Sequence, residues 1–476
     1  MAAITAVGAY APRFRITAEE FAEAWGHFQA SGISEKAVPS ADEDALTMAY
    51  EAATRAIEAS DFDAAEVDWL GFASSRPPAA EEDLTARLGA MLGLSSTTAR
   101  QTFTGSTRAG TRALWAGMDA VETAAGTAVI VAADAPHGDP DDEIDHAAGA
   151  GAAAFVLEAN GPAELVDRAE YAAPYPGTRF RNTGEDETQG LGVTQYDRQA
   201  FTETIGGAVS GLEVESGPEA AAIQAPNGKL PYRAAGAAGV GTDEIQAAAT
   251  VHELGDLGAA SVPVSLAGAL TDGYESILAV SHGSGAGADA LLVTVSGDVP
   301  AKIAIESDDA ISYADYLRQR GIVTSGPPSG GGAYVSVPSW RRSLPQRYRL
   351  EAGRCPECGA LAFPPEGSCD DCGALAEYDP IELPGEGVIE AVTTISQGGA
   401  PPEFAAQQSQ SGDYAAAIVA LEAETDRETV SIPAMGTDAD PSAFAVGDRV
   451  ETTIRRIYTQ EGVTRYGFKI RPSDDE

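Results

Sequence analysis

Lysine is nearly absent from this chain of 476 residues, which contains only Lys36, Lys229, Lys302 and Lys469. The 72 acidic residues far outnumber the 30 basic ones, and the formal net charge is −42 at pH 7. Such an excess of acid repels phosphate backbones and argues against general nucleic-acid binding. Because 44% of the residues are apolar, the chain is expected to fold, and its halophilic composition indicates an acidic surface suited to high salt.

Long hydrophobic segments are missing as well. No apolar run reaches the roughly 20 residues that span a bilayer, and the amino terminus lacks the basic and apolar regions of a secretory signal. We therefore expect a cytoplasmic protein that does not contact membranes. A chain of 476 residues is long enough for two or three domains with a sizeable core.

Cysteine is scarce, and the four cysteines lie close together. Cys355 and Cys358 form one Cys-x-x-Cys pair, Cys369 and Cys372 form a second, and glycine follows each pair. Two pairs at this spacing place four thiolates at the corners of a tetrahedron, which Zn²⁺ fills with no open position for chemistry. Two disulfides would require a secreted protein, and a redox centre needs only one pair. We therefore predict a structural zinc ribbon.

Arginines gather next to the ribbon, in a chain that is otherwise poor in basic residues. Guanidinium groups beside Trp340 and Tyr348 suit phosphates that lie against an aromatic plane. Pairing with the protein's own acidic surface explains the same cluster equally well, so both interpretations stay open. The five arginines are Arg341, Arg342, Arg347, Arg349 and Arg354.

Strand-like and helix-like segments alternate through the first 325 residues, and the pattern occurs twice. His146–Leu157 and His282–Val293 both run from a histidine through Gly-Ala-Gly into an apolar strand. A helix rich in small residues is predicted ahead of each, over 108–123 and 259–270. This repeat predicts a duplicated α/β domain with five layers, α/β/α/β/α, and largely parallel strands.

The last third of the chain follows another plan. Five short, β-branched segments after the ribbon fit a small barrel of the OB type. The few aromatic residues on them argue against binding of single-stranded nucleic acid. The segments are 387–396, 414–421, 428–435, 449–458 and 462–470. The expected domains are two halves at 1–165 and 166–325, a linker at 326–339, an arginine-rich helix and ribbon at 340–383, and the barrel at 384–476.

Several motifs, in this order, resemble a known family. AVGAYAPRFRI, EKAVPSADEDALTMA, IQAPNGKLPYR and SHGSGAGAD resemble segments of archaeal 3-hydroxy-3-methylglutaryl-CoA synthase, over residues 1 to about 325. The resemblance implies a thiolase fold and acyl-CoA as ligand. Residues 336–472 are similar to the zinc-ribbon and OB-fold proteins that scaffold archaeal thiolase–synthase complexes, which implies a rubredoxin-like ribbon. It also implies a homodimer or a hetero-oligomer with a thiolase.

The family's chemistry needs a cysteine nucleophile, a histidine and a glutamate base, and this chain departs from all three. The resemblance places Thr107 at the nucleophile position, Gln224 at the histidine position and Ser74 at the glutamate position. Asp256 stands where the family has asparagine. A threonine hydroxyl needs a base, and a glutamine side chain cannot accept a proton. We therefore predict a catalytically degenerate relative of these acyltransferases.

Two other interpretations of Thr107 stay open. The residue can cap the helix that follows it, or it can act as a nucleophile with His146 or His282 as its base. The second keeps an active enzyme in view, either an acyltransferase or a carbon–carbon lyase that forms no acyl-cysteine. A structural module without any ligand is a third hypothesis.

Acyl-CoA binding does not depend on the missing groups. Lys229 and Arg233, in Pro-Asn-Gly-Lys-Leu-Pro-Tyr-Arg, lie where the resemblance implies contacts with CoA. A lysine inside this motif, in a chain with so few, favours a phosphate contact over surface pairing with Asp or Glu. The sequence therefore predicts an acyl-CoA-binding protein that scaffolds or assists a thiolase-type partner.

Overall fold

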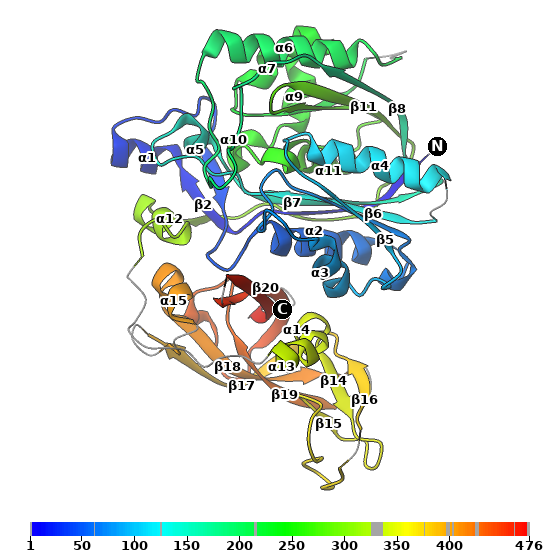
Figure 1. Ribbon diagram of the computed structural model, residues 1–476, viewed down its shortest axis with the longest axis vertical. Coiled ribbons are helices and arrows are strands. Elements are labelled where there is room, and N and C mark those ends of the chain that lie inside the picture. The colour runs from blue at the N-terminus through cyan, green and yellow to red at the C-terminus, as the bar shows by residue number, and fades with distance from the viewer. Residues whose placement is uncertain are drawn as a thin grey trace. The chain divides into compact units, whose positions relative to one another are not determined.

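The computed structural model forms two compact units (Figure 1). The first comprises Met1–Pro39 and Glu43–Tyr316, and the second comprises Ser40–Asp42 and Leu317–Glu476. Most of the predicted linker, 326–336, lies outside the described residues, and the other domain boundaries stay predictions. The structure describes residues 2–60, 62–123, 126–213, 217–324, 337–375, 377–396, 400–401, 404–423, 428–460 and 462–473.

A ten-stranded sheet forms the framework of the first unit. Its order is β5-β4-β6-β7-β1-β8-β11-β10-β9, with β12 paired to β1. The strands are β1 (Ala3–Tyr10), β4 (Trp69–Ala73), β5 (Ala99–Phe103), β6 (Ala128–Asp134), β7 (Gly151–Glu158), β8 (Ala163–Ala172), β9 (Ala220–Ile223), β10 (Ser276–Gly283), β11 (Gly287–Val295) and β12 (Ala301–Ala304). A smaller sheet contains β2 (Phe14–Thr17), β3 (Glu35–Val38) and β13 (Asp309–Ala310).

The strand pairing confirms the predicted duplication, but the prediction of largely parallel strands is wrong, because antiparallel pairs outnumber parallel ones among the described strands of this sheet. In the first half, β4 is parallel to β6, while β7 is antiparallel to both β6 and β1. In the second half, β9 is parallel to β10, while β11 is antiparallel to both β10 and β8. Antiparallel pairing of β1 with β8 joins the two halves. The two Gly-Ala-Gly segments therefore occupy equivalent places, at the starts of β7 and β11.

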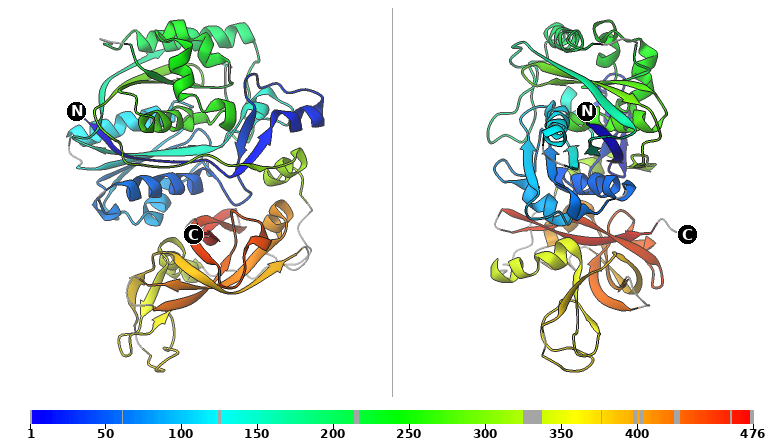
Figure 2. Two further views of the ribbon diagram at one scale, coloured as in Figure 1. Left: turned by 180° about the vertical axis from the view of Figure 1, so that it is seen from behind. Right: turned by 90° about the vertical axis from the view of Figure 1, so that its right-hand side faces the viewer.

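Helices complete five layers (Figures 1 and 2). The central layer is α4 (Ala109–Thr123) and α11 (Ser261–Thr271). On one outer face, α2 (Ala45–Ala59) and α3 (Leu84–Met91) cover the first half of the sheet, and on the other, α6 (Thr194–Val209) and α9 (Thr242–Ala248) cover the second. The remaining helices are α1 (Ala18–Trp25), η1 (Ala64–Glu66), α5 (Glu143–Ala147), α7 (Leu230–Arg233), α8 (Ala235–Ala238), α10 (Val251–Leu254), η2 (Gly258–Ala260) and α12 (Tyr313–Gln319).

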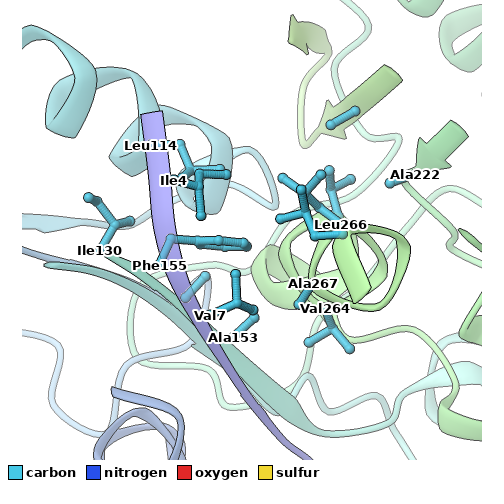
Figure 3. Packing of buried hydrophobic residues seen from close by; sticks show 14 of the residues in the cluster. Ile4, Val7, Leu114, Ile130, Ala153, Phe155, Ala222, Val264, Leu266 and Ala267 are labelled. Atoms are coloured by element: carbon cyan, nitrogen blue, oxygen red, sulfur yellow. The ribbon is translucent and has the colours of Figure 1, made fainter. Parts of the chain in front are cut away.

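Small residues let the central layer pack closely. A side chain at Gly110 of α4 would meet the carbonyl oxygen of Ala259 at 2.3 Å, so glycine is required there. Helix α11 is buried nearly all round, as its apolar sequence requires. Figure 3 shows Leu266 of α11 packed among the side chains that the sheet contributes, Ile4 and Phe155 among them.

The second unit contains a small three-stranded sheet and a nearly closed five-stranded one. The first consists of β14 (Glu351–Arg354), β15 (Leu361–Ala362) and β16 (Asp379–Glu382). The second has the order β19-β18-β17-β20-β21, and a bridge between Gly436 and Ile470 brings its two ends together. Its strands are β17 (Glu386–Ile395), β18 (Tyr414–Glu422), β19 (Thr429–Met435), β20 (Arg449–Gln460) and β21 (Val463–Pro472).

These five strands confirm the predicted barrel segments, and the naming of the barrel as an OB-fold stays a prediction. The helices of this unit are α13 (Val337–Arg342), α14 (Leu344–Arg349), α15 (Ala405–Ser411) and η4 (Pro441–Ala443). Within the described residues, no helix combines the length and the apolar character needed to cross a bilayer.

Ser40–Asp42 belongs to the second unit through a buried ion pair. Oδ2 of Asp42 accepts hydrogen bonds from Nζ of Lys469 at 2.7 Å and from Oγ1 of Thr437 at 2.9 Å. Burial alone would raise the pKa of the Asp42 carboxyl, but Lys469 and Arg455 outweigh burial and hold the pKa below its ordinary value. Burial lowers the pKa of Lys469. The two charges therefore depend on one another, because neither is exposed to water.

Candidate functional site

The four cysteines of the ribbon form a cluster that fits zinc. Their sulfur atoms all lie within 4.8 Å of one another. The Sγ–Sγ distance is 3.8 Å between Cys355 and Cys372 and 3.6 Å between Cys358 and Cys369. A tetrahedral zinc with Zn–S bonds of about 2.3 Å requires sulfur atoms about 3.8 Å apart. The predicted four-thiolate site is therefore present, and it is closed to a further ligand.

Backbone turns hold the thiolates in place. The amides of Gly359 and Gly373 donate to the carbonyl oxygens of Cys355 and Cys369, each at 2.8 Å. Both glycines have positive φ, +84° and +69°, which other residues adopt only with strain. The glycine after each cysteine pair therefore ends the turn that aims two sulfur atoms at the metal position.

The arginines near the ribbon are largely engaged within their own unit. Nε of Arg349 donates to Glu382 at 3.1 Å, and Nη1 of Arg354 donates to Glu428 at 2.7 Å. The Arg347 guanidinium lies 4.7 Å from the centre of the Trp340 ring. These contacts favour pairing with the protein's own groups over a phosphate site at these three positions.

The first unit contains a pocket of about 930 Å³, counting its open mouth. Strand ends bring its wall together: Gln224 follows β9, His282 lies near the end of β10, and Thr107 precedes α4. Asp256 and Arg179 also line it. Ligand sites in open α/β sheets lie at such carboxyl ends of strands. Two of the three predicted site positions, Thr107 and Gln224, therefore share one cavity.

Thr107 is buried, and its hydroxyl donates to a main-chain carbonyl oxygen rather than to a side-chain base. Its Oγ1 donates to the main-chain carbonyl of His282 at 2.6 Å. Oγ of the neighbouring Ser106 accepts the Arg108 amide at 3.2 Å, and the helix-cap interpretation of Thr107 stays a prediction. The lone pairs of the Thr107 oxygen remain available as acceptors.

Gln224 is 2% exposed, and only one of its two polar side-chain atoms has a hydrogen-bond partner among the described residues. Its Nε2 donates to the carbonyl oxygen of Gly258 at 2.9 Å, while its Oε1 has no partner among the described residues. Asp256 lies next to it, accepts the Gly258 amide at 2.9 Å, and pairs with Nη1 of Arg179 at 2.6 Å. The wall of the pocket therefore holds a buried acceptor beside a neutralised guanidinium.

Ser74 lies behind the pocket rather than in its wall. Its Oγ donates to Oδ1 of Asp134 at 3.2 Å, and Oδ2 of Asp134 accepts the Ala259 amide at 2.8 Å. Ala259 follows Gly258, the partner of Gln224. The residue at the predicted glutamate position is therefore connected to the pocket only through other groups.

The two candidate histidines differ. His146 is fully buried, accepts the Gln29 amide through Nδ1 at 3.0 Å, stacks on Phe28, and does not line the pocket. His282 lines the pocket, and its Nδ1 lies 3.0 Å from Oγ1 of Thr204. Burial, with smaller effects of Arg108 and Arg179, lowers the pKa of His282 to about 3. The His282 ring is therefore neutral near pH 7 and weakly basic.

Four acidic residues also line the pocket. Asp142, Glu143 and Asp197 line it together with Asp256. Burial raises the pKa of Glu143, and the charges of Asp142 and Asp197 raise it further. Burial also raises the pKa of Asp197, and its Oδ1 has no partner among the described residues. Arg179 is the only cation among the residues that line this pocket.

The predicted CoA contacts lie beside the pocket. Asn227 and Leu230 line it, and Oδ1 of Asn227 accepts the amides of Lys229 and Leu230, each at 3.0 Å. Lys229 and Arg233 are exposed, and neither forms an ion pair with any residue that the structure describes. Both side chains are thus available to an anion near the pocket.

Known proteins are similar to this chain in sequence over about two thirds of its length. The hydroxymethylglutaryl-CoA synthase of Methanocella arvoryzae is 30% identical over 343 residues, which cover 68% of this chain and 98% of the relative. The chain belongs to the hydroxymethylglutaryl-CoA synthase family. The family member from Archaeoglobus fulgidus is 30% identical over 347 residues, covering 67% of this chain and 98% of its own.

Solved structures and a domain family agree with this assignment. MvaS in complex with 3-hydroxy-3-methylglutaryl coenzyme A matches with a TM-score of 0.58 at 18% identity, covering 70% of this chain and 94% of the other. 3-Oxoacyl-[acyl-carrier-protein] synthase III from Aquifex aeolicus matches with a TM-score of 0.55 at 17% identity, covering 62% and 100%. Residues 342–376 match the ChsH2 rubredoxin-like zinc ribbon domain. The predicted thiolase-like fold and zinc ribbon are therefore confirmed.

Several residues of this synthase-family pocket were not predicted. Arg179 lies on the long loop between β8 and α6, and no spacing in the sequence links it to Asp256. Thr204 is one polar residue within α6, and only the fold places it against His282. The acidic run at 139–145 is visible in the sequence, but nothing local shows that part of it faces a cavity.

Proposed function

We propose that this member of the hydroxymethylglutaryl-CoA synthase family binds acyl-CoA in the pocket of its first unit without forming an acyl-enzyme. The observation that carries this proposal is that Thr107 and Gln224 line the same cavity. The Thr107 hydroxyl donates to a carbonyl oxygen, and Gln224 cannot accept a proton from it. The nucleophile position thus has neither a thiolate nor a base.

The other candidate groups do not repair this loss. Ser74 donates to Asp134 behind the pocket and has no carboxylate with which to deprotonate a thioester. His282 has a ring nitrogen in the pocket, but its pKa of about 3 makes it a poor proton acceptor near neutral pH. We infer that the family's cysteine, histidine and glutamate are all functionally absent.

Ligand binding is supported by the neighbours and by unpaired cations. Structures similar in fold hold 3-hydroxy-3-methylglutaryl coenzyme A and CoA. In this chain, Lys229 and Arg233 are exposed beside the pocket and unpaired among the described residues. Their charges suit the phosphates of CoA, with the acyl chain directed into the cavity.

The second unit supplies the scaffolding part of the proposal. A closed four-thiolate site stabilises a fold and cannot bind a substrate. We infer that the ribbon and the five-stranded barrel contact a thiolase-type partner, with the first unit also pairing with a second copy or with that partner. Acyl-CoA would then be held beside a catalytically competent enzyme.

An active acyltransferase or carbon–carbon lyase is the alternative. The observation in its favour is His282, whose ring is the only imidazole that lines the described pocket. An enzyme of that kind would release or transfer product without an acyl-cysteine. Purified chain incubated with 3-hydroxyacyl-CoA should then yield a shortened thioester by itself.

The two functions separate in one experiment. The chain is titrated calorimetrically with acetyl-CoA, and acyl transfer and thioester cleavage are then assayed with and without a co-encoded thiolase. We expect binding, no turnover by the chain alone, and increased turnover or retention of intermediate when the thiolase is present. Turnover by the chain alone would instead establish the alternative, and absence of binding would leave only a structural role.

A further inference from the structure

Three polar groups in the pocket wall present hydrogen-bond acceptors to a ligand. Oε1 of Gln224, in a side chain that is 2% exposed, has no partner among the described residues. Leaving a buried acceptor unpaired costs free energy, which a ligand that donates a hydrogen bond recovers. We therefore expect a ligand group that donates a hydrogen bond to Oε1 of Gln224.

Two further groups in the wall, Thr107 and His282, also present hydrogen-bond acceptors to a ligand. The proton of Thr107 Oγ1 goes to the His282 carbonyl, so only the lone pairs of Thr107 face a ligand. The Thr204 hydroxyl donates to the Ala200 carbonyl at 2.8 Å. It must therefore accept from Nδ1–H of His282, which leaves Nε2 of His282 as an acceptor.

The charges that line the pocket are strongly unbalanced. Asp142, Glu143, Asp197 and Asp256 contribute four carboxyl groups, and Arg179 contributes the single cation. That cation is already engaged with Asp256 at 2.6 Å. Its free Nη2 can donate to a neutral carbonyl oxygen, but its charge is not available to offset a second carboxylate.

We propose that the pocket selects acyl thioesters whose acyl chain carries a hydroxyl and no carboxylate. This inference rests on the proposed binding of acyl-CoA and names the class of acyl group. The hydroxyl donates to Oε1 of Gln224, and the thioester or chain oxygen accepts from Arg179. A dicarboxylic acyl group, such as the one named for the MvaS complex, is disfavoured because its free carboxylate meets the acidic wall.

Three thioesters with chains of equal length test the selection on the unmodified protein. Pentanoyl-CoA, 3-hydroxypentanoyl-CoA and glutaryl-CoA are titrated calorimetrically at one salt concentration. A net hydrogen bond increases affinity by about threefold to tenfold, so the hydroxylated ligand should bind that much more tightly than pentanoyl-CoA. Glutaryl-CoA should bind at least about tenfold more weakly than pentanoyl-CoA, because its free carboxylate lies near carboxylates of the wall that no cation offsets.

Variants assign each preference to its residues. Gln224→Leu should abolish the advantage of the hydroxyl, so that 3-hydroxypentanoyl-CoA and pentanoyl-CoA bind this variant with about equal affinity. Asp197→Asn combined with Glu143→Gln should restore binding of glutaryl-CoA. Asp243→Asn is the matched control, because Asp243 is exposed on α9 and lies outside the pocket wall, and it should leave the discrimination intact.

The outcomes distinguish this inference from the function on which it rests. If no thioester binds the unmodified protein, the proposed function itself fails. If all three bind with equal affinity, acyl-CoA binding stands and the selection is refuted. Tighter binding of glutaryl-CoA than of pentanoyl-CoA would likewise refute it, because the wall would then attract a carboxylate.

Discussion

The hydroxyl of Thr107 donates a hydrogen bond of 2.6 Å to the main-chain carbonyl of His282. Thr107 precedes the first central helix, α4, and His282 lies near the end of β10, so this contact joins the two halves of the duplicated fold. A donor fixed on a carbonyl has no base to take its proton. The contact holds Thr107 in the pocket wall, and under the proposed function it is the reason why Thr107 does not attack a thioester.

Lys229 should determine much of the affinity for acyl-CoA. A charge-assisted contact with phosphate is worth about 1.5–3 kcal/mol, so Lys229→Ala should weaken binding by about tenfold or more. Thermal stability should stay nearly unchanged because the side chain is exposed. The loss should shrink in molar salt, where screening extends only about 3 Å.

Lys302→Ala is the matched control, since Lys302 is exposed and pairs with Glu58 at 3.0 Å, away from the pocket wall. Calorimetric titration of both variants at two salt concentrations makes the comparison. Equal affinity of Lys229→Ala and unmodified protein at low salt would show that Lys229 is an ordinary surface residue.

The ribbon should contain about one zinc per chain. Cys372→Ser should lose the metal and the order of residues 351–382, because metal binding and folding are coupled in such small modules. The CoA affinity of the first unit should be retained. Elemental analysis and backbone amide exchange provide the measurements, with Ser368→Ala as a control within the ribbon. Zinc-free protein with a fully ordered ribbon would contradict a structural metal.

The buried pair of Asp42 and Lys469 should be important for stability. Asp42→Asn leaves Lys469 buried without the carboxylate with which it pairs, which costs about 3–5 kcal/mol. Asp42→Asn combined with Lys469→Met should recover much of this loss, because the uncompensated lysine charge is then gone. Chemical unfolding monitored by circular dichroism measures the stability of the single and the double variant. An unchanged unfolding midpoint for Asp42→Asn would show that Lys469 does not depend on the Asp42 charge.

The same pair predicts a pH effect. Because the pKa of Asp42 is lowered in the folded state, its contribution is complete above the ordinary aspartate pKa of about 3.9 and declines as pH falls through the folded value. Acid should therefore destabilise the unmodified protein more steeply than Asp42→Asn. The free energy of unfolding is measured against pH for both proteins. Parallel slopes below about pH 4 would mean that the Asp42 carboxyl does not contribute to stability.

The sequence predicted the parts of the fold that depend on local pattern. The Cys-x-x-Cys spacing fixed the metal site, and the repeated His…Gly-Ala-Gly segments revealed the duplication, because turns and periodicity are local properties. The pairing of Arg179 with Asp256 joins residues 77 positions apart. The unpaired Oε1 of Gln224 depends on how the end of β9 meets η2, which holds Gly258, so it could be found only in three dimensions.

The most direct test is the intact mass of the protein after incubation with acetyl-CoA. Unmodified chain should show no acetyl adduct, while Thr107→Cys serves as the positive comparison, because a thiol near a helix start is readily ionised and nucleophilic. The account predicts that acetyl-CoA binds in a calorimetric titration and that the unmodified protein shows no mass increase at any time point. A stable increase of one acetyl group that disappears in Thr107→Ala would contradict the account and establish Thr107 as a nucleophile.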